Sequence, residues 1–196
     1  MSKTLYEKSF EHDACGVGLV ASIDGVRTNK VLKKAIEAVV NLTHRGAVGG
    51  DKKTGDGAGV LTQLPLELFD EFLSEKDVNQ VTIGNFGVGM FFLPKKENIL
   101  HKKSLELINK IIKEHNLNLI SSREVPVDDS ALGEKALEAK PSIFQFFVTD
   151  NDFLNQDEFE RKLLLIRKTL ERESLKAKIN DFYCCSFSSR TIVYKG

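Results

Sequence analysis

The stretch Glu11-His12-Asp13-Ala14-Cys15-Gly16-Val17-Gly18 decides how the rest of the chain is interpreted. A short polar leader ends at one cysteine, and a glycine-spaced apolar run begins directly after it. If the Ala14–Cys15 bond were cleaved, Cys15 would carry a nucleophilic sulfur and a free α-amine able to act as its base. The ordinary alternative is a buried thiol, since a cysteine on a strand is usually a small core residue.

The composition is that of a globular domain rather than a disordered or membrane-spanning chain. The 196 residues are 41% hydrophobic and 29% charged, which is enough to bury a sizeable core. Lys plus Arg and Asp plus Glu balance at 28 each, so the basic surplus typical of nucleic-acid or anionic-membrane partners is missing. Residues 1–14 contain no hydrophobic signal core, and no window approaches the roughly 20 apolar residues of a membrane span. The cytosol is therefore the expected location.

The three cysteines do not form a disulfide framework. Their number is odd, and adjacent residues such as Cys184 and Cys185 seldom pair with each other. These two lie in an apolar strand pattern, where neighbouring side chains point to opposite faces. We expect both of them to be core residues.

Hydrophobic periodicity predicts alternating strands and helices. Strands are expected at 15–23, 60–64, 83–93, 117–125 and 143–149, the last covered on both faces, with a long strand or a hairpin at 182–194. Helices are expected at 30–43, from Pro65 to about Leu73, and at 97–115, 130–139 and 156–176. An Asp24-Gly25 turn follows the first strand. This order favours a layered α/β sandwich over a regular doubly wound sheet.

A glycine-rich loop occupies residues 46–59, with six glycines in its fourteen positions. Its backbone must turn tightly or approach another group closely. It is not a Walker loop, because no Gly-Lys-Ser/Thr follows, and it precedes a strand instead of opening a helix as a dinucleotide fingerprint does. Arg45 beside it has two equal interpretations: it pins a carboxylate, or it braces the loop.

Several other polar residues have simpler structural interpretations. His12 lies three residues before Cys15, but no second pair completes a metal site. His101 and His115 fall on the polar side of a predicted helix, where we expect solvated side chains. Arg190 lies in the last strand segment and is expected to be structural, with a role near a site left open.

Five ordered segments together resemble the start of the glutamate synthase large subunit family. They are Glu11 to Gly18, Leu42-Thr43-His44-Arg45-Gly46-Ala47-Val48-Gly49, Lys53-Thr54-Gly55-Asp56-Gly57-Ala58-Gly59-Val60, Arg123-Glu124-Val125-Pro126-Val127, and Ser188-Ser189-Arg190-Thr191-Ile192-Val193-Tyr194-Lys195-Gly196. The resemblance implies an α+β Ntn-hydrolase fold, a four-layer αββα sandwich of antiparallel sheets. The chain would supply the amino-terminal portion of that sandwich.

The resemblance also implies a chemistry. Residues 1–14 would be a leader removed to expose Cys15, and residues 15–196 the amino-terminal part of a type 2 glutamine amidotransferase domain. Cys15 would attack the side-chain amide of L-glutamine, giving a γ-glutamyl thioester and ammonia, and the ammonia would travel to a second site for reductive amination of 2-oxoglutarate. Arg45 falls on the family's arginine beside the nucleophile, which favours a role in the site. Gly46 would let the loop pass close to the cysteine.

The chain also departs from the family pattern. The family's later His-Ser-Arg-Phe-Ser-Thr-Asn and His-Asn-Gly motifs, which supply the carboxylate-gripping arginine and the oxyanion hole, are not in this sequence. The 196 residues alone are therefore expected to be inactive. The parent would carry FMN and an iron–sulfur cluster elsewhere, with a synthase domain and a small reductase subunit or ferredoxin as partners, and no cofactor site is expected here. Two alternatives remain: another Ntn amidase, or a silent fragment that keeps its leader.

Overall fold

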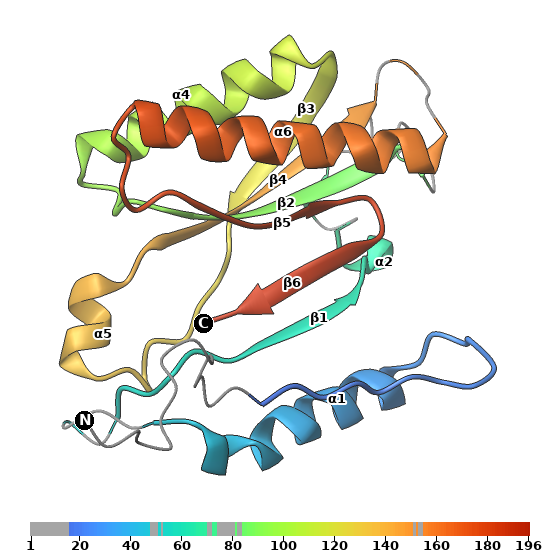
Figure 1. Cartoon of the computed structure of the whole chain (residues 1–196), viewed down its shortest axis with the longest axis vertical. Helices are drawn as coiled ribbons and strands as arrows, with labels where there is room; N and C mark the ends of the chain where they lie inside the picture. Colours follow the sequence, from blue (N-terminus) through green and yellow to red (C-terminus); the bar gives the residue numbers. More distant parts are fainter. Residues whose placement is uncertain are drawn as a thin grey trace, which may run out of the picture.

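The computed structural model describes residues 16–47, 51, 53–69, 72, 73, 81, 84–150, 152 and 155–196. Figure 1 shows four layers, which from top to bottom are two long helices, a four-stranded sheet, a two-stranded sheet and another helix. Both sheets are antiparallel throughout. This order of layers confirms the predicted αββα sandwich. The leader 1–14 and Cys15 lie outside the described residues.

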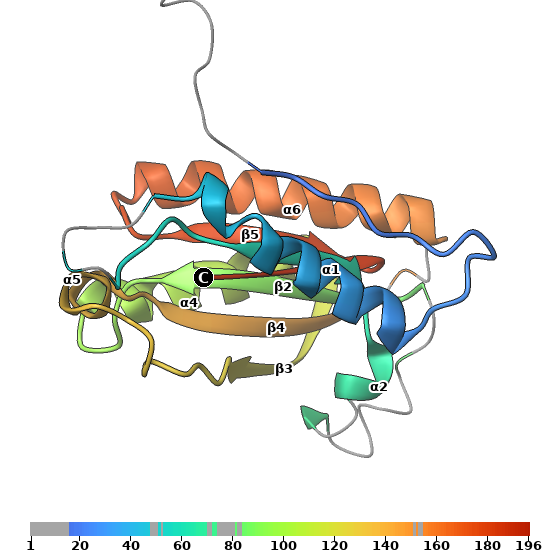
Figure 2. The ribbon, with the colours of Figure 1, turned by 90° about the horizontal axis from the view of Figure 1, so that it is seen from below.

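The larger sheet forms the centre of the molecule. Its strands run in the order β3 (Leu117–Glu124), β4 (Ser142–Asp150), β2 (Phe86–Leu93) and β5 (Tyr183–Ser188), and Figure 2 shows them side by side behind α1. The helices α4 (Ile99–Glu114) and α6 (Gln156–Lys176) pack on one face of this sheet.

Alternating side chains of the central strands fill two separate cores. Phe146 and Val148 of β4 face the helices, whereas Phe147 between them faces the smaller sheet. The strand is apolar on both sides because both of its faces are covered, as predicted. Cys184 and Cys185 also divide between the two cores and are buried, which confirms their structural interpretation.

The smaller sheet joins β1 (Gly59–Gln63) to β6 (Thr191–Lys195). The prediction of one long strand or a hairpin at 182–194 is wrong, because β5 and β6 are consecutive yet belong to different sheets. The bend between them is held by α6: Glu160 accepts hydrogen bonds from the Ser188 hydroxyl at 3.0 Å and from the Ser189 amide. Arg190 pairs with Asp157 of the same helix, which supports the structural interpretation of this arginine.

The outermost layer is α1 (Asn29–Asn41), followed by the 3₁₀ turn η1 (Thr43–Arg45). The helix confirms the one predicted at 30–43, with bounds shifted by one or two residues, and Thr28 caps its start. The predicted turn at Gly25 forms with φ +71°. The strand predicted at 15–23 is wrong for the part that the structure describes, since residues 16–22 pair with no strand. A strand needs a partner for its backbone hydrogen bonds, and an alternating pattern cannot supply one. The apolar side chains stay exposed, with Val17 and Leu19 each at 93%.

Two short helices are found in the predicted order with shorter bounds. Pro65 precedes α2 (Leu66–Phe69), and α5 (Glu134–Ala139) begins four residues later than expected. No helix among the described residues is long and apolar enough to cross a membrane. The prediction of a solvated His101 is wrong: the side chain is 7% exposed, and its Nδ1 lies 2.8 Å from the Pro94 carbonyl oxygen. The first turn of α4 lies against the residues that follow β2. The imidazole of His101 is therefore buried there and hydrogen-bonded to the backbone.

The solvent face of α6 carries a small ion cluster that supports one prediction. Glu171 accepts from Arg167 at 2.9 Å and Lys168 at 2.8 Å. Partial burial raises the pKa of Glu171, but the hydrogen bonds from these cations outweigh it and hold the pKa below 4.5. The stabilisation is therefore complete above pH 4.5 and is lost as the pH falls through the lowered pKa. Glu171→Gln is expected to reduce the free energy of unfolding at pH 7 by about 0.5–1 kcal/mol, measured by urea titration. The same cost at pH 2.5, or an equal cost for exposed Glu138→Gln, would contradict this assignment.

Candidate functional site

Two of the five segments singled out in the sequence lie side by side at the β1–β6 pair. Gly59 is paired with Lys195 in the strand register. Beyond the strands, Ala58 and Gly196 exchange two backbone hydrogen bonds of 2.9 and 3.0 Å. The glycine-rich segment therefore runs along the last residues of the chain, where Figure 1 marks the C-terminus.

This close approach explains two of the loop's glycines. A Cβ atom at Gly57 would lie 2.8 Å from the Gly196 carbonyl oxygen. One at Gly59 would lie 2.8 Å from the Lys195 Cβ. Real Cβ atoms do not approach other heavy atoms so closely, so only glycine fits both positions without a shift. The predicted close approach is confirmed, and the group approached is a neighbouring strand.

Gly57→Ala is expected to lower the free energy of unfolding by about 1–3 kcal/mol, because the new methyl group must push the Gly196 backbone away. Denaturant unfolding of the 196-residue chain measures the effect. Gly18→Ala is the matched control, since its added methyl group would make only an ordinary contact of 3.7 Å with Ala38. Equal costs for the two substitutions would show that the close approach does not constrain residue 57.

The two arms of the loop are tied together next to Arg45. The Ala47 amide donates to the Asp56 carboxylate at 2.8 Å, and the Asp56 amide donates to the Ala47 carbonyl at 3.1 Å. Nearby, the Asp51 carboxylate accepts from the side chain of Thr54 at 2.5 Å and from its amide at 2.9 Å, and these bonds lower the pKa of Asp51. The loop is thus folded on itself by carboxylate–amide hydrogen bonds.

Arg45 and Gly46 lie at the base of this loop, directly after α1. Arg45 ends η1, is exposed, and forms no ion pair with any residue that the structure describes. Gly46 has φ −90°, and a Cβ there would lie 3.6 Å from the Thr43 carbonyl oxygen, an ordinary contact. Nothing in the described part of the fold requires glycine at position 46.

The residue that follows the candidate nucleophile lies close to the same place. A Cβ at Gly16 would lie 3.0 Å from the Leu42 side chain, and Leu42 is three positions before Arg45. Further along, Gly18 is near Ala38, one turn earlier in α1, so the segment runs back along the helix. Because Cys15 is outside the described residues, its contact with Arg45 stays a prediction.

The buried side chains of the strands include one polar group that the sequence analysis did not single out. Gln145 of β4 is fully buried, and its Oε1 accepts from Arg123 Nε at 2.7 Å. Tyr194 of β6 has a buried hydroxyl with no hydrogen-bond partner. Arg123 and Tyr194 each belong to one of the five family-like segments. Gln145 does not, but a glutamine in the middle of an apolar strand is a sequence signal for a buried polar group.

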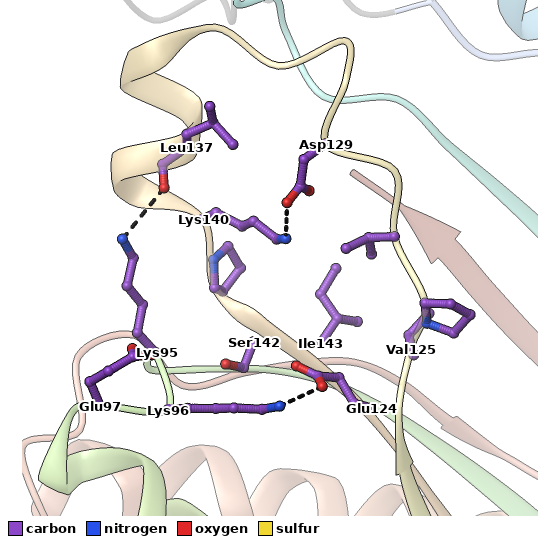
Figure 3. A pocket seen from close by; sticks show the side chains of 13 residues that line it. Lys95, Lys96, Glu97, Glu124, Val125, Asp129, Leu137, Lys140, Ser142 and Ile143 are labelled. Carbon is purple, nitrogen blue, oxygen red and sulfur yellow. Dashed lines mark hydrogen bonds and ion pairs between the residues drawn. The ribbon is translucent and has the colours of Figure 1, made fainter.

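The structure also contains a groove of about 510 Å³ beside α5. It is lined by the ends of β2 and β3 and the start of β4, as Figure 3 shows. Four of its charged side chains form two ion pairs: Lys96 with Glu124 at 2.5 Å, and Lys140 with Asp129 at 2.6 Å. Lys95 donates to the Leu137 carbonyl oxygen at 3.4 Å. None of the candidate site residues from the sequence lies in this groove.

Metal and thiol chemistry have little support among the described side chains. No cluster of three or more His, Cys, Asp and Glu residues in the described ranges could hold a metal ion. Burial raises the pKa of both the Cys184 and Cys185 thiols. A thiol with a raised pKa is a poor nucleophile at neutral pH, so neither residue competes with Cys15 for that role.

Comparisons with known proteins identify the family of this chain. The family model for class-II glutamine amidotransferases matches residues 15–196. Over its length the chain is similar to curated glutamate synthases. It is 39% identical to the glutamate synthase [NADPH] large chain of Bacillus subtilis over 98% of this chain, and 37% identical to that of Azospirillum brasilense over 97% of this chain. It is 38% identical to the ferredoxin-dependent glutamate synthase of Pyropia yezoensis over 100% of this chain. It spans 12–13% of the length of these relatives. The chain belongs to the class II glutamine amidotransferases, and within them it resembles glutamate synthase large chains.

Proposed function

We propose that this chain is the amino-terminal part of the glutaminase domain of a glutamate synthase large subunit. Residues 1–14 are its leader, and residues 15–196 belong to the amidotransferase domain. The observation that carries the proposal is the family match, which begins at the candidate nucleophile and runs to the last residue. The similarity to glutamate synthases of both the NADPH and the ferredoxin type supports the same assignment.

The mechanism starts with the loss of the leader. The free α-amine of Cys15, with an ordinary pKa of about 7.7–8, takes the thiol proton at neutral pH. The thiolate attacks the side-chain amide carbon of L-glutamine, and the proton passes to the departing nitrogen, which leaves as ammonia. Water then hydrolyses the γ-glutamyl thioester, releasing glutamate and restoring the thiol. The ammonia is channelled to the parent's second site, where reductive amination of 2-oxoglutarate gives glutamate.

Arg45 and Gly46 serve this reaction from the base of the loop. Support for Arg45 comes from its lack of an ion-pair partner among the described residues and from the position of Gly16 near Leu42. A guanidinium there can brace the loop beside Cys15 or pair with a carboxylate of the substrate. Gly46 leaves room for close approach to the nucleophile.

The remainder of the large subunit is the proposed partner of the outer layer. The segment 16–26, α1 and β1 together expose several large apolar side chains, among them Val17, Leu19, Ile23, Ile36, Val40 and Leu61. Large exposed apolar side chains in this number are typical of a chain that has an interface. The same remainder supplies the oxyanion hole and the carboxylate-binding arginine, and losing one oxyanion donor alone costs about 10²–10³ in rate. We therefore propose that the 196 residues turn over little glutamine by themselves.

The remaining parts of the proposal concern the parent enzyme. FMN and an iron–sulfur cluster bind in its synthase part, with a small reductase subunit or ferredoxin as electron donor, and the enzyme acts in the cytoplasm. Among the described residues of this chain, no cluster of three or more His, Cys, Asp and Glu side chains could bind a metal ion. No step proposed for this chain involves them.

Intact mass tests the proposal in two proteins, the parent synthase and the 196-residue chain. Each is treated with a glutamine-mimicking electrophile, and the amino-terminal residue and the labelled residue are identified. We expect the parent to begin at Cys15 and to carry one label there. Retention of residues 1–14 with no label at Cys15 in the parent would overturn the nucleophile assignment. Competition by simple amides as effective as that by glutamine would point to another Ntn amidase.

A further inference from the structure

One side chain at the end of β6, that of Lys195, reaches from the smaller sheet to the larger one. Its Nζ lies over the Tyr183 ring, 4.4 Å from the centroid, and 5.8 Å from the centroid of the Phe92 ring. The two rings are cross-strand neighbours, since Phe92 of β2 is paired with Tyr183 of β5 and their centroids are 5.9 Å apart. Lys195 therefore connects β6 to two strands of the larger sheet.

The other end of the same side chain is held by the glycine-rich loop. Lys195 is paired with Gly59 of β1, and a Cβ at Gly59 would lie 2.8 Å from the Lys195 Cβ. The lysine stem thus begins directly against the Gly59 backbone, where the loop 46–59 enters β1.

The ring faces are the electrostatic partner of this lysine. Lys195 forms no ion pair with any residue that the structure describes. The face of an aromatic ring carries partial negative charge and attracts an ammonium group placed over it. The contact therefore depends on the charge of residue 195 and on a ring at position 183.

The place of this contact connects it to the candidate site. Gly196, the next residue, exchanges two backbone hydrogen bonds with Ala58, and two positions before Ala58 the Asp56 carboxylate accepts from the Ala47 amide. Figure 1 shows the end of β6, marked C, beneath β5 and beside β1. A series of direct contacts thus runs from the two rings to the base of the loop.

We propose that Lys195 is a positioning residue: its ammonium, held over Tyr183 and Phe92, fixes the end of β6 and with it the glycine-rich loop. The inference rests on the proposed function, in which Arg45 and Gly46 serve the reaction from the base of this loop. A neutral side chain of similar length would keep the apolar stem but lose the attraction to the rings.

Amide hydrogen exchange in the 196-residue chain tests the contact itself. In Lys195→Met we expect the Ala58 and Gly196 amides to exchange about two- to fivefold faster, as the loss of an exposed cation–π contact predicts. The amides of the central strand β4 should keep their rates. Lys195→Arg should retain the wild-type rates, because a guanidinium also stacks on aromatic faces. Tyr183→Leu should act like Lys195→Met, whereas Tyr183→Phe keeps a ring and should not.

Two further measurements complete the test. Lys103→Met removes an exposed lysine from α4 and should change none of these rates. In the parent synthase, glutamine-dependent glutamate synthesis should fall about two- to tenfold in Lys195→Met, because a displaced loop positions its groups less well. It should return in Lys195→Arg, and synthesis from added ammonium should be unchanged in both variants.

Unchanged exchange in Lys195→Met, or equally fast exchange in Lys195→Arg, overturns the contact. An equal acceleration in β4 overturns it as well, because that is what global destabilisation produces. Faster exchange at Ala58 with full glutamine-dependent activity overturns the positioning role. If the wild-type parent has no glutamine-dependent activity, the proposed function fails, while the contact stands or falls on the exchange rates alone.

Discussion

Cys15→Ala in the parent synthase is expected to abolish glutamine-dependent glutamate synthesis, with a loss of at least about 10³-fold. In the proposed mechanism the Cys15 thiol supplies the atom that forms the thioester. Neither of the two described cysteines is suited to replace it, because burial raises the pKa of both the Cys184 and the Cys185 thiols. Steady-state rates with glutamine as the nitrogen donor measure the effect.

The same variant has an internal control. Glutamate synthesis from added ammonium should persist in Cys15→Ala, because ammonia then enters at the second site without glutamine hydrolysis. Cys184→Ala should keep glutamine-dependent activity per folded molecule. Substantial glutamine-dependent activity in Cys15→Ala would require a different nucleophile, whereas loss of both activities would mean that the substitution disturbs the whole enzyme.

Leu163→Ala should have the largest effect on stability among these variants, lowering the free energy of unfolding by about 2–5 kcal/mol. Leu163 is 0% exposed on α6 and packs on β2, where a Cβ built on Gly87 would lie 2.9 Å from its Cδ1. The glycine brings the helix so close to the sheet that no neighbouring side chain can fill the space left by the leucine. The cavity therefore stays, and its cost adds to the lost apolar burial.

Leu164→Ala is the matched control on the next residue of the same helix. Leu164 is 51% exposed, so the same truncation should cost less than about 1 kcal/mol. Urea unfolding of the 196-residue chain compares the two midpoints at constant slope. Equal losses would mean that α6 is not seated on the sheet through Leu163.

The core strands were predictable because the alternation of apolar side chains along a strand indicates which of its two faces are covered. Phe86, Val88 and Met90 alternate with Phe91 and Leu93 across β2, and each set lies in a different core. The helix caps were equally local: Asn155 accepts from Glu158 at the start of α6, where a capping residue precedes the apolar stripe. Such features depend on residues a few positions apart.

The misses depend on residues far apart in the chain. The alternation at 16–23 is real, but pairing needs a second strand, and the described residues provide none there. The pattern at 182–194 predicts one long strand or a hairpin. In the structure, Glu160 on α6 binds Ser188 at the bend between β5 and β6, and β6 pairs in the other sheet. The residues within a few positions of these segments do not indicate whether a pairing strand or a binding helix lies next to them.

The candidate site divides in the same way. The sequence by itself determined the alternation of strands and helices and, through five short segments, the layered fold, the family and its candidate nucleophile. Only the tertiary structure placed Gly57 against Gly196, tied Ala47 to Asp56 beside Gly46, and joined Arg123 of β3 to Gln145 of β4. Periodicity indicates burial because burial favours apolar residues at each covered position. These contacts instead join residues of different segments, which meet only when the strands pair and the loop folds.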